Sequence, residues 1–150
     1  MDAFRAPLDN DNWACNSWYE NGLNNLGHRA SRRSVYTRKD GSVVVSYTVE
    51  AQAPHAYKRT GGTSGRISVA ADGKPFGADD FKFTAMQVWT VYPDGSVELE
   101  SSISSNKQSL VLPRLGYMLR VPKDMRKYTY YGRGPVNNYN DRKTGQFVGS

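Results

Sequence analysis

The sequence has 150 residues, which is enough for one domain with a single hydrophobic core. Its net charge is +6 and its pI is near 9.5, but Lys and Arg are spread along the chain without a block of like charge, which argues against a nucleic-acid partner. Cys15 stands alone, which excludes an internal disulfide and a cysteine-based metal site, and no stretch approaches the roughly 20 apolar residues of a membrane helix.

The first predicted elements are a loop and a short helix. Residues 1–16 contain Pro7 and the run Asp9-Asn10-Asp11-Asn12, residue types that favour turns, and are predicted to form a loop. Residues 17–27 predict one short helix, with Ser17 at its N-cap and Glu20 three residues later in a capping-box pattern. Gly22 weakens this helix, and Gly27 is expected to end it.

Strand patterns dominate the rest of the sequence. Loops are predicted at residues 53–63 and 101–108, a turn at Asp72-Gly73 and a break at residues 132–135. The Tyr92-Pro93-Asp94-Gly95 turn predicts a hairpin between the two strands that flank it. The predicted strands are residues 41–50, 66–71, 74–76, 83–92, 96–102, 115–121 and 128–131. About seven short strands, with turn signals roughly every eight to twelve residues, indicate an all-β fold, an antiparallel β-sandwich.

The first informative motif is residues 4–11, Phe-Arg-Ala-Pro-Leu-Asp-Asn-Asp, which places one guanidinium and two carboxylates in a tight loop. One interpretation is structural: Arg5 pairs with an Asp, and the Asx side chains cap turns. The other is a polar cluster beside a sugar site, since Arg, Asp and Asn hydrogen-bond hydroxyl-rich ligands.

Two further motifs lie in the second half of the chain. Residues 130–142 contain two glycines followed by Pro135, a rigid aromatic and polar loop. A Gly-x-Gly element suggests phosphate binding only where it opens a helix, and Pro135 argues against that here. Residues 112–116 resemble the start of a strand, and Arg114 there is expected to pair with a carboxylate, either in the interior or at an interface.

Glu98 and Glu100 are the only two glutamates close together in the sequence. They share one face of a predicted strand, with Cα atoms about 6.6–6.8 Å apart, so a catalytic pair is geometrically conceivable. The strong alternation of that strand favours a solvated strand face instead. No catalytic residue is therefore assigned.

In this order, the three motifs resemble the small-chain domain of β-galactosidases of glycoside hydrolase family two. That domain opens with Trp-Arg-Ala-Pro-Thr-Asp-Asn-Asp, continues to a Leu-Pro-Arg-x-Gly strand and ends in a Gly-x-Gly-Pro-x-Glu-Asn-Tyr-x-Asp-Arg loop. Residues 18–23, Trp-Tyr-Glu-Asn-Gly-Leu, resemble the short helical stretch of the family. The sequence departs from the pattern at Phe4, Leu8 and Asn137, which replace Trp, Thr and Glu.

The resemblance implies that residues 1–150 are the N-terminal portion of a small-chain domain, a single domain and a piece of a longer chain. It also implies that these residues adopt part of a galactose mutarotase-like supersandwich fold. It also implies a non-catalytic role, supporting a barrel domain that carries both catalytic Glu residues and edging the carbohydrate site. The family hydrolyses β-galactosides with retention of configuration, which uses two carboxyl groups about 5–5.5 Å apart. No metal or cofactor is expected in this segment, and Mg or Na would belong to another domain of the parent enzyme.

The resemblance and the aromatic content together suggest two sets of site residues. Expected to contact substrate are Arg5, Asp9, Asn10, Asp11, Trp13 and Trp18. Expected to form the structural motifs are Arg114, Tyr131, Gly134, Asn138, Tyr139, Asp141 and Arg142.

The expected partners are the remaining domains of the parent glycosidase and a β-galactoside or another glycan, with no nucleic acid and no membrane. Missing partner strands would leave open sheet edges, which predicts a homodimer through those edges. A stand-alone carbohydrate-binding module is the alternative, and a salt-sensitive nucleic-acid binder is a third hypothesis. The compartment is left open between the bacterial cytoplasm and the periplasm of the parent enzyme.

Overall fold

The computed structural model describes residues 1–60, 68–134 and 144–149. The chain divides into two units, Met1–Met118 and Leu119–Ser150. The first unit contains nearly all of the regular structure.

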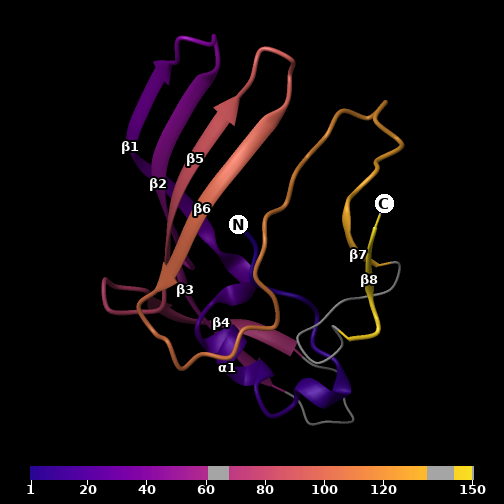
Figure 1. Cartoon of the computed structure of the whole chain (residues 1–150). Coiled ribbons are helices and arrows are strands. Elements are labelled where there is room, and N and C mark those ends of the chain that lie inside the picture. The colour runs from indigo at the N-terminus through magenta and orange to yellow at the C-terminus, as the bar shows by residue number, and fades with distance from the viewer. Residues whose placement is uncertain (61–67, 135–143, 150) are drawn as a thin grey trace. The chain divides into compact units, whose positions relative to one another are not determined.

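A four-stranded antiparallel sheet is the main element of the first unit (Figure 1). Its strands lie in the order β1-β2-β5-β6, so each of its two hairpins is contiguous in sequence. The strands are β1 (Gly27–Thr37), β2 (Val43–Gln52), β5 (Phe83–Val91) and β6 (Val97–Ser105). β2 and β5 are the central strands and carry the buried side chains, whereas β1 and β6 are the edges.

The turns of the two hairpins in this sheet both contain the sequence Asp-Gly-Ser. Asp40 and Asp94 each accept hydrogen bonds from the backbone N–H and the hydroxyl of the serine two residues later, at 2.6–2.9 Å. Gly41 and Gly95 have φ angles of 86° and 85°, which an L side chain adopts only with strain. The chemistry of these turns is local, so each can be specified by its own few residues.

Strand β1 is an edge strand whose eleven residues are all exposed. A β-bulge shifts its register between Ser31 and Ser34, and Arg32 in the bulge has a left-handed φ of 52°. Arg29, Arg32 and Arg33 make this edge basic. A bulged, positively charged edge is a poor template for another strand.

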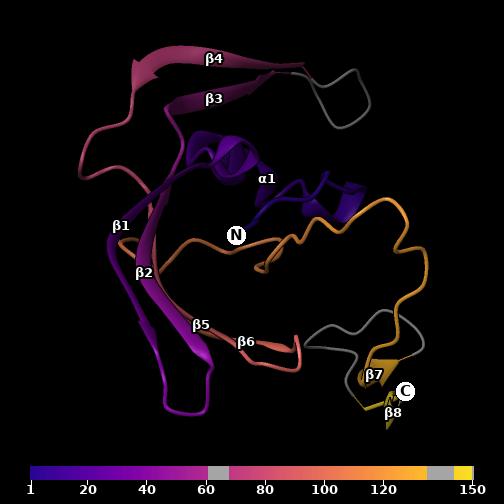
Figure 2. The same ribbon diagram turned by 90° about the horizontal axis from the view of Figure 1, so that it is seen from above.

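A second hairpin and a short helix complete the first unit. β3 (His55–Thr60) pairs antiparallel with β4 (Ser68–Pro75), and helix α1 (Cys15–Glu20) packs against β3. Two 3-10 turns, η1 (Asp9–Asp11) and η2 (Leu23–Asn25), flank the helix. Figure 2 shows α1 on the inner side of the curved main sheet.

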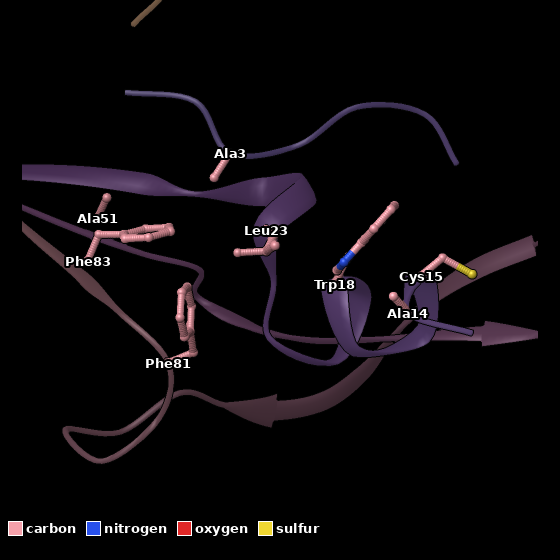
Figure 3. Packing of buried hydrophobic residues seen from close by; sticks show 8 residues of the cluster. All are labelled: Ala3, Ala14, Cys15, Trp18, Leu23, Ala51, Phe81 and Phe83. Atoms are coloured by element: carbon pink, nitrogen blue, oxygen red, sulfur yellow. The ribbon is translucent and has the colours of Figure 1, made fainter. Parts of the chain in front are cut away.

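The hydrophobic core lies between α1 and the ends of the two central strands (Figure 3). Phe81 and Phe83 are 1% and 2% exposed, and their rings meet edge to face with centroids 4.8 Å apart. Partly buried side chains such as Ile103 and Leu112 pack around this cluster. Its buried members are Ala3, Ala14, Cys15, Trp18, Leu23, Ala51, Phe81 and Phe83.

In the second unit, β7 (Gly132–Gly134) pairs antiparallel with β8 (Phe147–Gly149). Among the described residues of the chain, no helix is long and apolar enough to cross a membrane.

The structure confirms the all-β class, the strand at residues 83–92 and the hairpin at Tyr92–Gly95. The predicted helix is shorter than expected, and the prediction of Ser17 as its N-cap is wrong. Ser17 lies inside α1, and its hydroxyl donates to the Ala14 carbonyl at 2.7 Å. The helix ends early because Gly22 has a left-handed φ of 67°, and a Cβ there would collide with Ala53.

Several strand predictions are wrong for identifiable reasons. Strand β1 was not predicted, because its Arg- and Ser-rich sequence lacks apolar alternation. The loop predicted at residues 53–63 contains β3, and its residues 61–63 lie outside the described part of the chain. No turn occurs at Asp72-Gly73. These residues lie within β4 as a bulge, since Tyr57 pairs with Ala71 whereas His55 pairs with Pro75.

The remaining corrections lie toward the C-terminus. Strand β6 continues to Ser105, into the loop predicted at residues 101–108. The strands predicted at residues 115–121 and 128–131 are absent, although Gly116 forms an isolated bridge with Asp2. The break predicted at residues 132–135 is instead strand β7 over its first three residues. Residues 66 and 67 of another predicted strand lie outside the described residues.

Candidate carbohydrate site

The N-terminal loop is closed by a bidentate ion pair between Arg5 and Asp11. Arg5 Nη1 donates to Asp11 Oδ2 at 2.5 Å, and Nη2 donates to Oδ1 at 2.9 Å. The backbone N–H of Leu8 also donates to Oδ2, at 2.7 Å. The hydrogen bond from Arg5 holds the pKa of the Asp11 carboxyl below its ordinary value. Both side chains therefore serve to shape the loop, as the structural interpretation of this motif expected.

Trp18 is a core residue rather than a surface platform for a sugar. Its side chain is buried, and Nε1 donates to the Val111 carbonyl at 2.8 Å. The Arg5 guanidinium carbon lies 5.5 Å from the centre of the indole ring, within cation–π range. Of the residues expected to contact substrate, Trp18 is thus the one with the least accessible surface for a ligand.

Trp13 is the exposed aromatic residue of this region, at 76% exposure. It borders a surface cavity of about 370 Å³, together with Ser17 and Asn21 of the α1 region and Lys107. We call this cavity the Trp13 groove. Lys107 Nζ donates to Asn21 Oδ1 at 3.4 Å, and Asn21 Nδ2 donates to the Ser17 carbonyl at 2.8 Å. An accessible indole beside amide, hydroxyl and ammonium groups suits a sugar ring, which has an apolar face and hydroxyl edges.

The other residues of the first motif lie nearby on η1. Asp9 and Asn10 are exposed, and the Asp9 carbonyl accepts a hydrogen bond from Asn12 at 2.7 Å. Sequence reasoning missed Asn21 and Lys107 as groove residues. Asn21 lies in the short helical stretch and Lys107 in a distant loop, so only the fold brings them together.

The Leu-Pro-Arg-x-Gly motif tethers the start of the chain. Asp2 and Gly116 exchange backbone hydrogen bonds of 2.8 and 3.0 Å. Arg114 Nη2 lies 3.4 Å from Asp2 Oδ2, at a half-exposed position. This segment therefore holds the residues that precede the Arg5–Asp11 pair.

The third motif falls in the second unit and is described only in part. Tyr131 is 80% exposed. Gly134 ends strand β7, where an added Cβ would meet the Tyr130 hydroxyl, so a larger residue would require that side chain to move. The other predicted motif residues lie outside the described part of the chain: Asn138, Tyr139, Asp141 and Arg142.

All four glutamates are exposed, namely Glu20, Glu50, Glu98 and Glu100. Glu98 accepts a hydrogen bond from the Tyr92 hydroxyl at 2.6 Å, which raises the pKa of that phenol. Glu50 Oε1 lies 3.6 Å from Lys82 Nζ. Among the described residues, no group of three or more His, Cys, Asp or Glu side chains is placed to hold a metal ion.

A second surface feature lies on the inner face of the main sheet. Val35, Val45, Trp89 and Leu99 are cross-strand partners in one continuous row across all four strands. Val43, Val91 and Val97 form the next row on the same face. We call these seven residues the apolar rows.

The apolar rows continue the core face of the sheet toward the hairpin ends. The neighbouring part of this face, around Ala51, Phe83 and Ala85, is buried. Val35, Val97 and Val91 are instead 64%, 56% and 41% exposed. Three of the seven side chains are therefore exposed, and the other four are half-buried.

These features define an all-β protein with an exposed aromatic groove and a partly exposed apolar sheet face. The family model described as "Beta galactosidase small chain" matches residues 1–150, and the chain belongs to this family. The resemblance of the three motifs is thereby confirmed.

Curated relatives carry the name β-galactosidase. The protein from Priestia megaterium is 37% identical over 57 residues, which are 38% of this chain and 6% of the relative. The protein from Halalkalibacterium halodurans is 37% identical over 60 residues, with the same coverage. The protein from Staphylococcus xylosus is 24% identical over 148 residues, covering 97% of this chain and 12% of the relative. The matches thus span only 6–12% of the length of these relatives. No solved structure matches the chain significantly.

Proposed function

We propose that this chain is a non-catalytic part of a β-galactosidase. It packs against the rest of the enzyme through the apolar rows, and it borders the sugar site with the Trp13 groove. In this arrangement the chain supports the barrel domain, and a β-galactoside is the ligand.

The observation that carries this proposal is the set of apolar rows, of which Val35, Val91 and Val97 are exposed. Large contiguous apolar patches are uncommon on soluble monomers and mark interaction surfaces. Trp89 lies in the middle of the first row, and aromatic side chains are frequent energetic centres of interfaces. The family membership supports a partner that is itself part of a β-galactosidase.

The carboxylate arrangement supports a non-catalytic role. Retaining hydrolysis of a glycoside uses two carboxyl groups about 5–5.5 Å apart, one of them with a raised pKa. Glu98 and Glu100 lie on an exposed edge strand, and Glu98 is engaged by Tyr92. Glu50 pairs with Lys82. The chemistry of hydrolysis would then come from residues of another part of the enzyme.

The decisive experiment is complementation of a β-galactosidase from which the matching segment has been deleted. The 150-residue chain alone is expected to give no turnover of a chromogenic galactoside, and mixing the two parts is expected to restore it. Trp89→Ser should weaken the restored activity by weakening docking. Met86→Ser is the control on the same strand, because Met86 is exposed and lies on the opposite face from the half-buried Trp89.

Two results would contradict the proposal. One is turnover by the chain alone that disappears in Glu98→Gln. The other is restored activity that responds equally to Trp89→Ser and Met86→Ser.

A stand-alone carbohydrate-binding module is the second candidate, and the exposure of Trp13 favours it. Isothermal titration with galactose, lactose and longer β-galactans distinguishes the two. Binding by the chain alone that is lost in Trp13→Ala and unaffected by Trp89→Ser would support the module. Absence of heat with every glycan would support the enzyme component instead.

A further inference from the structure

A further cavity of the first unit lies away from the Trp13 groove. It has a volume of about 530 Å³, within the usual range of small-molecule sites. It is bordered by the first residues of β1, the last residues of β2 and the segments that flank β3 and β4. The cavity and the Trp13 groove have no lining residue in common.

Three charged side chains line this cavity. Arg29 and Glu50 are cross-strand partners, so their Cβ atoms lie about 4.5–5.5 Å apart on the same sheet face. Lys82 Nζ approaches Glu50 Oε1 to 3.6 Å. Two cations therefore accompany one carboxylate, and the cavity carries an excess positive charge.

The remaining wall combines a fixed amide with an aromatic ring. Gln52 Nε2 donates to the Gly77 and Asp80 carbonyls at 2.9 and 3.3 Å, which fixes the orientation of the side chain. The backbone N–H of Phe76 donates to the Pro54 carbonyl at 2.9 Å and anchors the half-buried ring beside the cavity. A ligand here meets an apolar surface and polar groups together.

Gly27 leaves part of the cavity open because it lacks a side chain. It is the cross-strand partner of Gln52, two residues before Arg29. A Cβ at Gly27 would lie 3.4 Å from the Gln52 carbonyl oxygen, an ordinary contact, and its φ is outside the left-handed region. A larger side chain can therefore occupy the cavity without straining the strand.

We propose that this cavity binds a hydroxylated ring that carries one carboxylate or phosphate group, such as an acidic sugar. The anionic group pairs with Arg29, since the ammonium of Lys82 already faces Glu50. A guanidinium suits carboxylate and phosphate oxygens because it can donate two parallel hydrogen bonds. The ring lies against Phe76, and its hydroxyls exchange hydrogen bonds with Glu50 and Gln52. This site is separate from the galactoside site proposed above.

The test is isothermal titration of the 150-residue chain with galacturonate, a hexose 6-phosphate and neutral galactose. Saturable binding of at least one acidic ligand is expected. The acidic ligand with the higher affinity shows whether the site prefers a carboxylate or a phosphate. Arg29→Gln should weaken this binding about tenfold, the effect of losing one charge-assisted hydrogen bond. Lys39→Gln is the matched control, because it removes one charge from the distant β1–β2 turn.

Gly27→Leu provides a second, steric test. It should abolish binding while leaving the thermal unfolding temperature of the chain unchanged or slightly raised, since Gly has a low β-strand propensity. The proposal is overturned if neither acidic ligand binds, or if neutral galactose binds as tightly as the better of the two acidic ligands. It is also overturned if Arg29→Gln and Lys39→Gln have equal effects, or if a folded Gly27→Leu variant still binds.

Discussion

Replacing Asp11 by Asn tests whether the Arg5–Asp11 pair holds the N-terminal loop. The substitution preserves shape but removes the charge that accepts two hydrogen bonds from Arg5 and one from Leu8. The two side chains are only 13% and 29% exposed, so water screens the pair incompletely. Losing a hydrogen bond to a charged group costs about 1.5–3 kcal/mol, and we expect about 2 kcal/mol here. For a chain of this size that lowers Tm by about 6 °C.

The assay is urea unfolding at pH 7 and again in acid, with Asp9→Asn as the control in the same loop. Because Arg5 lowers the pKa of Asp11 in the folded state, the stabilisation is complete above the unfolded-state pKa, near about 3.9. It is lost as the pH falls below that value through the folded-state pKa. The stability of Asp11→Asn should therefore change less in this range than that of the unsubstituted chain. Equal stability of the two Asn variants at pH 7 would refute the reasoning.

Three further predictions concern stability, each measured by urea or thermal unfolding. Phe83→Ala should cost about 3–5 kcal/mol because it opens a cavity in the core, whereas Met86→Ala on the exposed face of the same strand should cost far less. Gly22→Ala should destabilise by more than about 1 kcal/mol, since the position has a left-handed φ and no room for a Cβ, whereas Gly116→Ala should be nearly neutral. Trp18→Phe should cost about 1 kcal/mol by removing the hydrogen bond to a backbone carbonyl, and a neutral result would mean that this bond adds nothing.

The features that could be predicted from sequence are those specified by local chemistry. The Tyr92–Gly95 turn was predictable because Pro, Asp and Gly each favour a defined backbone conformation. The turn at Asp40–Ser42 shares the Asp-Gly-Ser sequence but has Lys39 in place of Pro93, and it was not predicted to form a hairpin. The strand before it, β1, pairs through its backbone and leaves no apolar pattern in the sequence. Likewise, β4 contains a turn-like Asp72-Gly73, but pairing with β3 keeps the strand continuous as a bulge.

In the candidate site, too, features specified by local sequence were predictable and features set by tertiary packing were not. The pairing of Arg5 with an Asp was predictable from a short motif. Trp13 and Trp18 could not be distinguished, because they lie only five residues apart and packing alone decides which is buried. The contributions of Asn21 and Lys107 were beyond prediction, since tertiary structure alone brings them together.

The bulged, basic edge of β1 has a consequence for assembly. Because the other edge of the main sheet is β6, that side is where a further strand can join. A sheet with one open side cannot propagate head to tail, so edge-to-edge addition of identical copies would stop at a two-fold pair of β6 strands. The positive charges and the left-handed Arg32 would thus prevent strand addition at the β1 edge and so protect the chain against fibre growth. The β6 edge would remain available to a single partner.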